Sequence, residues 1–173
     1  MNLNPSHSTS NAQGTFSGAE AKECGACDAG TYSFWGASTC HECLPGTFSN
    51  ASRAANCSLC APGTFSLDGA TFCPPCAPGS YTDVVAQGVC TVCELGKYQP
   101  ANGTTTCIPC PLDTYQNDTG QTVCINCPDG RRTDDIGLKD PWRCSEICER
   151  GTIGVPLVPG GKSVKPCTPC SPG

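Results

Sequence analysis

Residues 43–60 read CLPGTFSNASRAANCSLC, and variants of this stretch fill most of the chain. Each copy has the form Cys-x-x-Gly-Thr-aromatic-Ser, a turn, and then Cys-x-x-Cys. The first seven cysteine pairs begin at residues 24, 40, 57, 73, 90, 107 and 124, so the step between pairs is 16 or 17 residues. A fixed period with the same residue types at each step indicates one small structural unit copied in tandem.

The composition indicates what must stabilise these repeats. Leu, Ile, Val and Phe supply 26 of the 173 residues. Chains in which these residues make up less than roughly 20% usually cannot fold by apolar burial alone. Cysteine supplies 18 residues, a density typical of oxidised scaffolds outside the reducing cytosol. The sequence therefore predicts a small disulfide-rich fold, mostly coil with short β-hairpins, arranged as an elongated extracellular rod with little hydrophobic core.

Charge is sparse over the repeats. The net charge is -5, and residues 1–128 hold only three of the ten basic side chains. Binding to nucleic acid is not expected, because phosphate contacts need clustered Lys and Arg. No apolar stretch has the length of a signal peptide core or a membrane span, so we expect neither within this segment.

Three regions are predicted along the chain. Residues 1–13 form a polar leader, residues 14–127 hold the regular 16–17-residue repeats, and residues 128–173 hold longer, degenerate repeats or a junction. In the last region the cysteine pairs are unevenly spaced, and Arg132 and Ile153 replace the aromatic residue. Terminal caps that differ from internal repeats are common in tandem arrays.

Glycine and an aromatic residue recur between the cysteine pairs. Glycine suits a backbone position that needs positive φ or close approach of another segment. It stands at positions 30, 46, 63, 79 and 96, and again at 130, 151 and 173, while Asp113 interrupts the series. We interpret the aromatic residue as a structural ring packed between disulfides rather than as a recognition element. These rings are Tyr32, Phe48, Phe65, Tyr81, Tyr98 and Tyr115.

Two dipeptides are strong signals for hairpin turns. Asp68-Gly69 and Asn102-Gly103 suit a type I′ turn, which requires positive φ at both central residues. With Asp68-Gly69 as the loop, Phe65 would face Phe72 across two short strands. Two-stranded hairpins are marginal in water, so each is expected to depend on its disulfide and on neighbouring repeats.

Two kinds of disulfide pairing compete, and spacing alone does not decide between them. A bond inside one Cys-x-x-Cys closes a very small loop and tends to be reducible. A bond from the second cysteine of one pair to the first of the next clamps a hairpin across its base, and we rank this ladder first. It joins Cys27 to Cys40, Cys43 to Cys57, Cys60 to Cys73, Cys76 to Cys90, Cys93 to Cys107, Cys110 to Cys124, Cys127 to Cys144 and Cys148 to Cys167. The ladder assigns no bond within the segment to Cys24 or Cys170.

Other chemistry of the cysteines is less favoured. Cys24, Cys27, Cys40 and Cys43 have the spacing of a four-cysteine zinc site. Such sites come as discrete blocks, whereas these pairs have equal neighbours on both sides, so zinc binding is kept as a remote alternative. A redox Cys-x-x-Cys needs one distinctive pair, and no hydrolase, phosphate-loop or metal-protease motif occurs. We expect no enzymatic activity, no cofactor and no catalytic or metal site.

Asn-x-Ser/Thr sequons agree with passage through the secretory pathway. They lie at Asn50, Asn56, Asn102 and Asn117. Three of them fall in the stretch expected at the hairpin tip, which predicts glycans along the edges of the repeats. Asn56 is expected to be the least occupied, because Cys57 in the middle of its sequon is predicted to form a disulfide.

The repeat from about Gly14 to Cys127 resembles the ephrin-receptor-like cysteine-rich repeat, whose pattern is Cys-x-x-Gly-Thr-Tyr-Ser, a variable stretch with Gly, and Cys-x-x-Cys. It is similar also to the first half-modules of tumour necrosis factor receptor repeats, which share Cys-x-x-Gly-x-Tyr/Phe. The resemblance implies a disulfide-linked segment of a large extracellular or cell-surface protein, and the ladder agrees with the receptor half-module. It does not imply a ligand.

Two functions remain open on the sequence. The first is a structural spacer in a glycosylated cell-surface or fibre-forming protein, whose partners are neighbouring repeats of the same or an identical chain. The second is a receptor or adhesion module that binds an extracellular protein or glycan. An exposed Phe34-Trp35 pair is a weak indication of the second.

Overall fold

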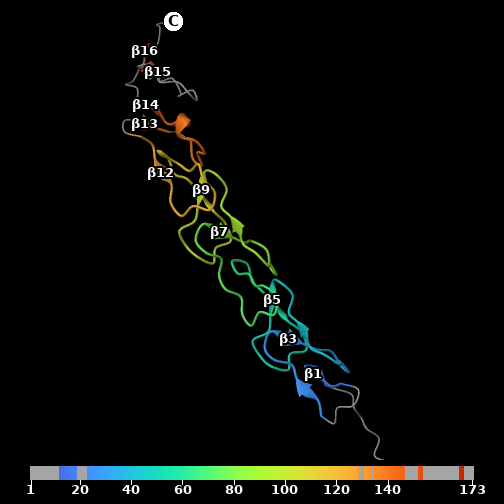
Figure 1. The fold of residues 1–173 in the computed structure, drawn as a ribbon. Coiled ribbons are helices and arrows are strands. Elements are labelled where there is room, and N and C mark those ends of the chain that lie inside the picture. Colours follow the sequence, from blue (N-terminus) through green and yellow to red (C-terminus); the bar gives the residue numbers. More distant parts are fainter. Residues whose placement is uncertain are drawn as a thin grey trace, which may run out of the picture. The chain divides into compact units, whose positions relative to one another are not determined.

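A computed structural model describes residues 12–18, 23–128, 131–133 and 135–146, together with two strands at 152–153 and 168–169. In these residues the backbone forms two-residue strands, turns and one 3-10 helix, η1 (Pro141–Arg143) (Figure 1). The strands are β1 (Thr15–Phe16), β2 (Gly25–Ala26), β3 (Thr31–Tyr32), β4 (His41–Glu42), β5 (Thr47–Phe48), β6 (Ser58–Leu59), β7 (Ser80–Tyr81), β8 (Thr91–Val92), β9 (Lys97–Tyr98), β10 (Ile108–Pro109), β11 (Thr114–Tyr115), β12 (Ile125–Asn126), β13 (Arg131–Arg132), β14 (Ser145–Glu146), β15 (Thr152–Ile153) and β16 (Thr168–Pro169).

Each strand pairs with one partner, in antiparallel two-stranded sheets. The pairs are β1-β2, β3-β4, β5-β6, β7-β8, β9-β10, β11-β12, β13-β14 and β15-β16. In the repeats from β3 to β12 the first strand carries the aromatic residue, and the second is the middle of the next Cys-x-x-Cys. Thus Thr47 faces Leu59 and Phe48 faces Ser58. This confirms the predicted fold class of short hairpins in a disulfide-rich, mostly irregular chain.

The position of the hairpin tip differs from the prediction. Thr64 forms an isolated antiparallel bridge with Pro75, and the Phe65 N–H donates to the Pro74 carbonyl at 3.1 Å. Phe65 therefore lies opposite Pro74, and the predicted pairing of Phe65 with Phe72 is wrong. The physical reason is a contact with another repeat, because the Gly69 N–H donates to the Cys43 carbonyl at 2.8 Å.

The prediction of a type I′ turn at Asn102-Gly103 is wrong for the same reason, a contact with another repeat. The Gly103 N–H donates to the Cys76 carbonyl at 2.8 Å, in the preceding repeat. Gly69 and Gly103 have positive φ, but Asp68 and Asn102 are not among the positive-φ residues. A type I′ turn needs both, so each dipeptide instead forms the tip of a wider loop.

Two series of backbone positions with positive φ run through the chain, each with the period of the repeat. The first is here called the turn position. It follows the second cysteine of a pair by three residues, except at Gly14, where Asn11 stands in place of that cysteine, and it contains Gly14, Gly30, Gly46, Gly63, Gly79, Gly96 and Asp113. The second, here called the tip position, contains Gly36, Arg53, Gly69, Ala86, Gly103, Gly120 and Gly137. The prediction of positive φ for the recurrent glycines is confirmed at residues 30, 46, 63, 79 and 96, whereas residues 130, 151 and 173 lie outside the described residues.

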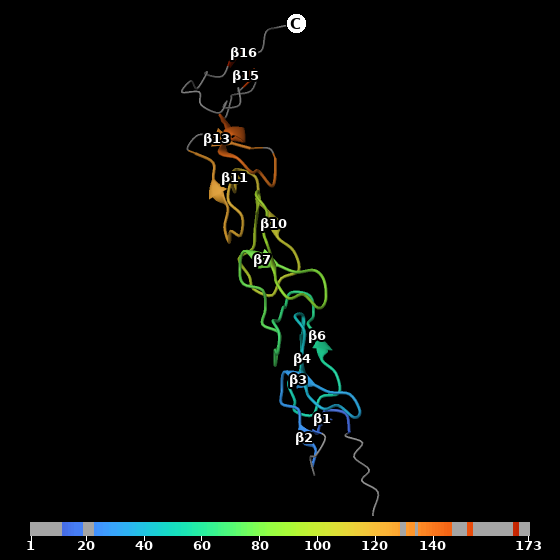
Figure 2. The same ribbon diagram turned by 45° about the vertical axis from the view of Figure 1, so that its right-hand side comes forward.

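The chain divides into two compact units, which we describe separately. Unit 1 comprises Met1–Pro75 and Thr82–Cys90, and unit 2 comprises Cys76–Tyr81 and Thr91–Gly173. Within each unit the hairpins follow one another in chain order (Figures 1 and 2).

Consecutive repeats within a unit are joined by three recurring backbone hydrogen bonds. In unit 1 the turn residue Gly30 donates its N–H to the Ser49 carbonyl at 2.8 Å. The Ser33 N–H donates to the Ala54 carbonyl at 3.1 Å, and the tip residue Arg53 donates its N–H to the Cys27 carbonyl at 2.8 Å. In unit 2 the equivalent bonds between the repeats that begin at Cys93 and Cys110 run from Gly96 to Gln116 (2.8 Å), from Gln99 to Gln121 (2.9 Å) and from Gly120 to Cys93 (2.8 Å).

Repeats that are next but one to each other also touch. The turn glycine of one repeat lies against the tip carbonyl of the repeat two further on, so that a Cβ atom added there would collide with it. The colliding pairs are Gly14 with Arg53, Gly30 with Gly69 and Gly46 with Ala86 in unit 1, and Gly79 with Gly120 and Gly96 with Gly137 in unit 2. The turn position therefore needs glycine both for positive φ and for close approach.

The buried interior consists mainly of cysteine and small polar residues. The second cysteine of each pair is at most 1% exposed at positions 27, 43, 60, 76, 93 and 110. The residue after the aromatic ring is also buried, namely Ser33, Ser49, Ser66, Thr82, Gln99 and Gln116, as is Thr133 after Arg132. Among the described residues, Leu138 is the one aliphatic side chain that is buried. For these residues the predicted lack of an apolar core is confirmed.

Candidate functional site

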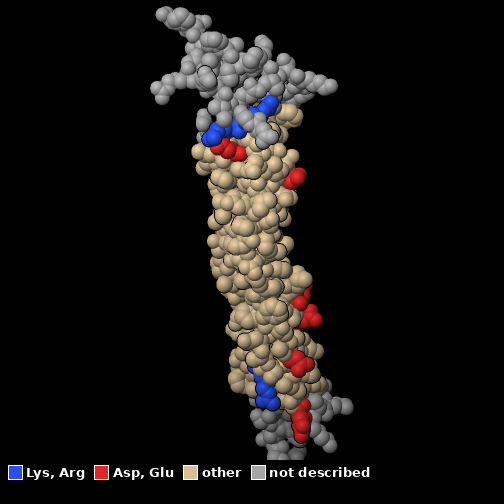
Figure 3. Space-filling view, turned by 90° about the vertical axis from the view of Figure 1, so that its left-hand side faces the viewer, with Lys and Arg blue, Asp and Glu red and all other residues tan. Residues whose placement is uncertain are grey.

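The surface of the repeats is poor in charge and rich in scattered apolar side chains. Acidic and basic side chains are few on the face shown in Figure 3. Phe34 and Trp35 are 57% and 66% exposed, and many aliphatic residues are exposed as well. Within the described residues no helix has the length and apolar character that crossing a membrane requires.

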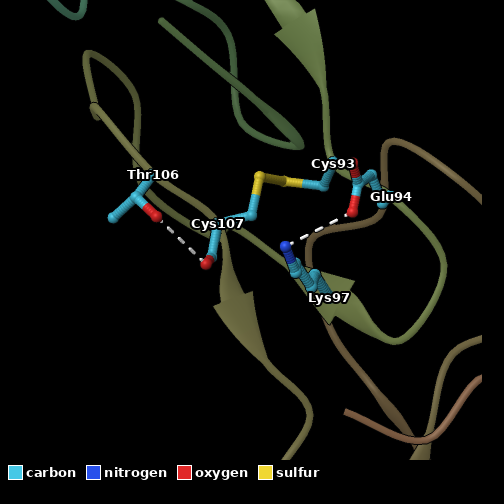
Figure 4. Close-up of polar contacts among 5 residues, drawn as sticks. All are labelled: Cys93, Glu94, Lys97, Thr106 and Cys107. Atoms are coloured by element: carbon cyan, nitrogen blue, oxygen red, sulfur yellow. Dashed lines mark hydrogen bonds and ion pairs between the residues drawn. A yellow bond between two sulfur atoms is a disulfide. The ribbon is translucent and has the colours of Figure 1, made fainter. Parts of the chain in front are cut away.

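The cysteines form a sequential disulfide ladder. The bonds join Cys27 to Cys40, Cys43 to Cys57, Cys60 to Cys73, Cys93 to Cys107, Cys110 to Cys124 and Cys127 to Cys144, with Cα–Cα distances of 5.7–5.8 Å. Cys76 and Cys90 are also disulfide-bonded. Figure 4 shows the bond between Cys93 and Cys107 at the base of one repeat. Cys24 is exposed, whereas Cys148, Cys167 and Cys170 lie outside the described residues.

The ladder bears directly on the zinc alternative. Zinc in four-cysteine sites is bound by thiolates. Cys27, Cys40 and Cys43 are all in disulfides, so three of the four sulfurs of that spacing carry no thiolate. Their arrangement does not fit a zinc site.

The aromatic residues lie at the edge of the interior rather than at its centre. Tyr32, Phe48, Phe65, Tyr81, Tyr98 and Tyr115 are all half-buried. Tyr32 makes an edge-to-face contact with Phe34, with ring centroids 5.4 Å apart, and a tilted contact with His41 at 5.8 Å. Rings in such arrangements attract each other beyond the area that they bury.

The buried polar residue after each ring is a structural site that the sequence reasoning did not single out. Gln99 donates Nε2–H to the Thr106 carbonyl at 2.7 Å, and its Oε1 accepts the Ala101 N–H at 3.1 Å. Gln116 repeats this arrangement with Val123 and Asp118, at 2.7 and 3.1 Å. These bonds close the loop from inside. The available signal was the presence of Ser, Thr or Gln directly after every ring from Tyr32 to Tyr115.

In unit 1 two of the serines at this position bind the preceding repeat, whereas Ser49 donates to Ala51 in its own repeat. Ser33 donates its hydroxyl to the Thr15 carbonyl and Ser66 donates its hydroxyl to the Thr47 carbonyl, both at 2.9 Å. No buried side-chain polar atom lacks a hydrogen-bond partner in the part of the chain that the structure describes. Polar burial is therefore compensated, as stability requires.

The residue after the turn glycine closes the turn with its side chain. Thr31 donates both its N–H and its hydroxyl to the Asp28 carbonyl, at 3.1 and 2.8 Å. Lys97 has no hydroxyl, and its Nζ instead lies 3.3 Å from Glu94 Oε2 (Figure 4). Both side chains of that ion pair are exposed, so it contributes little stability.

Asp113 occupies the turn position of its repeat and binds the next repeat through its carboxylate. Its φ is 65°. Oδ1 accepts the N–H of the buried Thr133 at 3.1 Å, and Oδ2 lies 3.5 Å from Arg132 Nη1. The side chain thus supplies contacts with the following repeat that no turn glycine can supply.

All four sequon asparagines are exposed. Asn102 directly precedes the tip residue Gly103, and Asn50 and Asn117 each stand three residues before a tip residue. Asn56 lines a shallow surface depression together with Cys57, Tyr32 and Phe34. Its low occupancy stays a prediction, as does the occupancy of the other three.

Comparison with known proteins agrees with the repeat architecture. The family described as tyrosine-protein kinase ephrin type A/B receptor-like matches residues 30–66, 83–112 and 96–144. The matched residues cover more than half of the chain and end at the last cysteine of the described ladder. No curated protein sequence matches the chain significantly. With the disulfide ladder and the family match together, the chain belongs to the ephrin-receptor-like family of cysteine-rich repeats.

Proposed function

We propose that this segment is a non-catalytic, extracellular spacer that holds other parts of a cell-surface or fibre-forming protein at a set separation. The observation that carries the proposal is the double contact that turn glycines such as Gly30 make within a unit. Gly30 donates a hydrogen bond to Ser49 in the next repeat and lies against the tip residue Gly69 in the repeat after that. Within a unit such a repeat is held by two neighbours, which suits a stiff element better than a flexible linker.

The extracellular placement is supported by the chemistry of the ladder. Fourteen of the described cysteines are in disulfides, and such bonds persist in oxidising compartments rather than in the cytosol. The exposed sequon asparagines and the family membership agree with a secretory route.

Small-angle X-ray scattering on the secreted chain tests the spacer. We expect a radius of gyration well above the value of about 16 Å for a compact globule of this length. The matched variant lacks residues 44–60, which removes one whole repeat and leaves Cys43 to pair with Cys73. Its maximum dimension should shorten by one repeat with the ladder otherwise intact. A compact particle, or a deletion that leaves the maximum dimension unchanged, would refute the spacer.

The alternative is a receptor or adhesion module, and one observation favours it. Phe34 and Trp35 are adjacent, large and more than half exposed, and aromatic residues of this kind often dominate protein interfaces. Substituting both with serine should abolish binding to an extracellular partner while leaving secretion intact. Binding that survives the double substitution argues against this surface.

A further inference from the structure

Two of the four sequons carry an aromatic residue two positions before the asparagine. Phe48 precedes Asn50 in this way, and Tyr115 precedes Asn117. The other two sequons lack it, because Pro100 stands two positions before Asn102 and Ala54 stands two positions before Asn56. The period of the repeat thus places a ring beside only some of the acceptor asparagines.

The burial pattern sets each ring and its asparagine apart from the residue between them, which is buried in the interior. Phe48 ends strand β5, and burial then alternates, with Phe48 half-buried, Ser49 buried and Asn50 exposed. Tyr115, Gln116 and Asn117 follow the same pattern after strand β11. In extended backbone, residues two apart point to the same face while the residue between them points to the other.

The outer surface of each ring is not covered by the paired strand. Phe48 faces Ser58, a small and exposed residue, across the hairpin. Tyr115 faces Ile125, which is 41% exposed. Each ring therefore has apolar surface that still contacts water.

The ligand that suits such a surface is a sugar ring. A pyranose presents C–H groups on one face, and these carry the partial positive charge that the face of an aromatic ring attracts. We propose that the first N-acetylglucosamine of the glycans at Asn50 and Asn117 packs against Phe48 and Tyr115, whereas the sugars at Asn102 and Asn56 do not contact such a ring. The inference rests on the proposed extracellular function, because the sugars are attached in the secretory pathway.

Nuclear magnetic resonance on the secreted chain tests the contact. Treatment with an endoglycosidase that leaves a single N-acetylglucosamine on each asparagine keeps only the sugar in question. Protons above an aromatic ring resonate upfield, so the sugars on Asn50 and Asn117 should show upfield shifts relative to the sugar on Asn102. Sugars present at Asn50 and Asn117 with the same shifts as at Asn102 would overturn the contact.

The chain offers a matched pair of ring deletions. Tyr98 and Tyr115 have equivalent places, since each is followed by a buried glutamine with the same two hydrogen bonds. Tyr115→Val should abolish the upfield shift at Asn117, whereas Tyr98→Val should leave every sugar resonance in place. A shift at Asn117 that survives Tyr115→Val would overturn the contact.

A new contact between a sugar and an aromatic ring can be engineered at Tyr98. The double variant Pro100→Asn, Asn102→Thr moves the sequon by two residues, to the place that Asn117 has in the next repeat. Its sugar should acquire the upfield shift, and an unshifted sugar would contradict the inference. A secreted, oxidised chain with bare Asn50 and Asn117 overturns this inference but not the spacer. A chain retained with reduced cysteines overturns both.

Discussion

Gly96 and Asp113 occupy the turn position in consecutive repeats, and both have positive φ, at 77° and 65°. Their surroundings differ. Gly96 lies against the carbonyl of the tip residue Gly137, whereas Asp113 directs its carboxylate to Thr133 and Arg132 in the next repeat. The same backbone conformation thus serves two different contacts.

The difference separates the two reasons for glycine at the turn position, namely positive φ and close approach of a tip carbonyl. Positive φ can be met by Asp, whose short polar side chain tolerates this region at modest cost. Asp cannot allow the close approach of a tip carbonyl, because any Cβ atom at the turn position collides with that carbonyl. The Cβ atom of Asp113 therefore excludes the kind of contact that Gly96 makes with the Gly137 carbonyl.

The largest expected effect comes from copying Asp113 into the earlier turn. Gly96→Asp places a Cβ against the Gly137 carbonyl and should destabilise the adjoining repeats by about 4 kcal/mol, from overpacking and backbone strain together. Hydrogen exchange followed by mass spectrometry should show faster local opening around residues 93–144, since each repeat depends on its neighbours.

Gly36 supplies the control for this substitution. Its φ of 71° is similar, but no atom lies within 4 Å of an added Cβ. Gly36→Ala should cost only about 1 kcal/mol, the price of positive φ alone. Equal exchange in the Gly36→Ala and Gly96→Asp variants would show that the tip contact does not matter.

The second prediction removes one disulfide on each side of the comparison. The bonds Cys93–Cys107 and Cys110–Cys124 both span 14 residues, and each contributes about 3 kcal/mol by loop entropy. Replacing either pair with serine should raise local exchange to a similar degree. A much smaller effect for the pair at 110 and 124 would mean that the Asp113 contacts hold that repeat together without its disulfide.

The third prediction concerns Asp113 itself. Asp113→Ala leaves the buried Thr133 N–H without its acceptor and should cost about 1.5 kcal/mol. Asp113→Asn keeps an acceptor oxygen and loses only the exposed ion pair with Arg132, so it should cost less than about 0.5 kcal/mol. Exchange of the Thr133 amide measures both, and an unchanged rate in the alanine variant would contradict the carboxylate's role.

The smallest effect is expected next to Gly96. Lys97→Thr exchanges an exposed ion pair with Glu94 for the hydroxyl that closes the other turns, as Thr31 does. Thermal denaturation without reductant should differ from the parent chain by less than about 0.5 kcal/mol. A larger loss would show that the Lys97–Glu94 pair contributes more than an exposed pair usually does.

The parts that could be predicted from the sequence depend on residue types with narrow geometric requirements. The period, the ladder order and the turn glycines belong to this group, because Cys and Gly have geometric requirements that few other residues meet. The tip position was missed because Arg53 and Ala86 stand in it beside five glycines, so composition does not mark it.

The errors arise where a contact with another repeat overrides local preference. Asp68-Gly69 favours a tight turn by itself, but the Gly69 N–H binds Cys43 in the preceding repeat. The buried Gln99 was missed for a different reason. Glutamine is usually exposed, and here it is buried because backbone groups of its own loop, at Thr106 and Ala101, bind its side chain.

The disulfide ladder also determines how far the chain can be stretched. The shortest covalent path from Cys27 to Cys43 crosses the disulfide to Cys40, with Cα atoms 5.7 Å apart. It then follows the backbone for three residues, or about 11 Å when extended. After reduction the same interval becomes 16 residues of open chain, or about 55 Å. Under tension an oxidised repeat can therefore lose its hydrogen bonds and gain little contour length, so its redox state sets the extensibility of the chain.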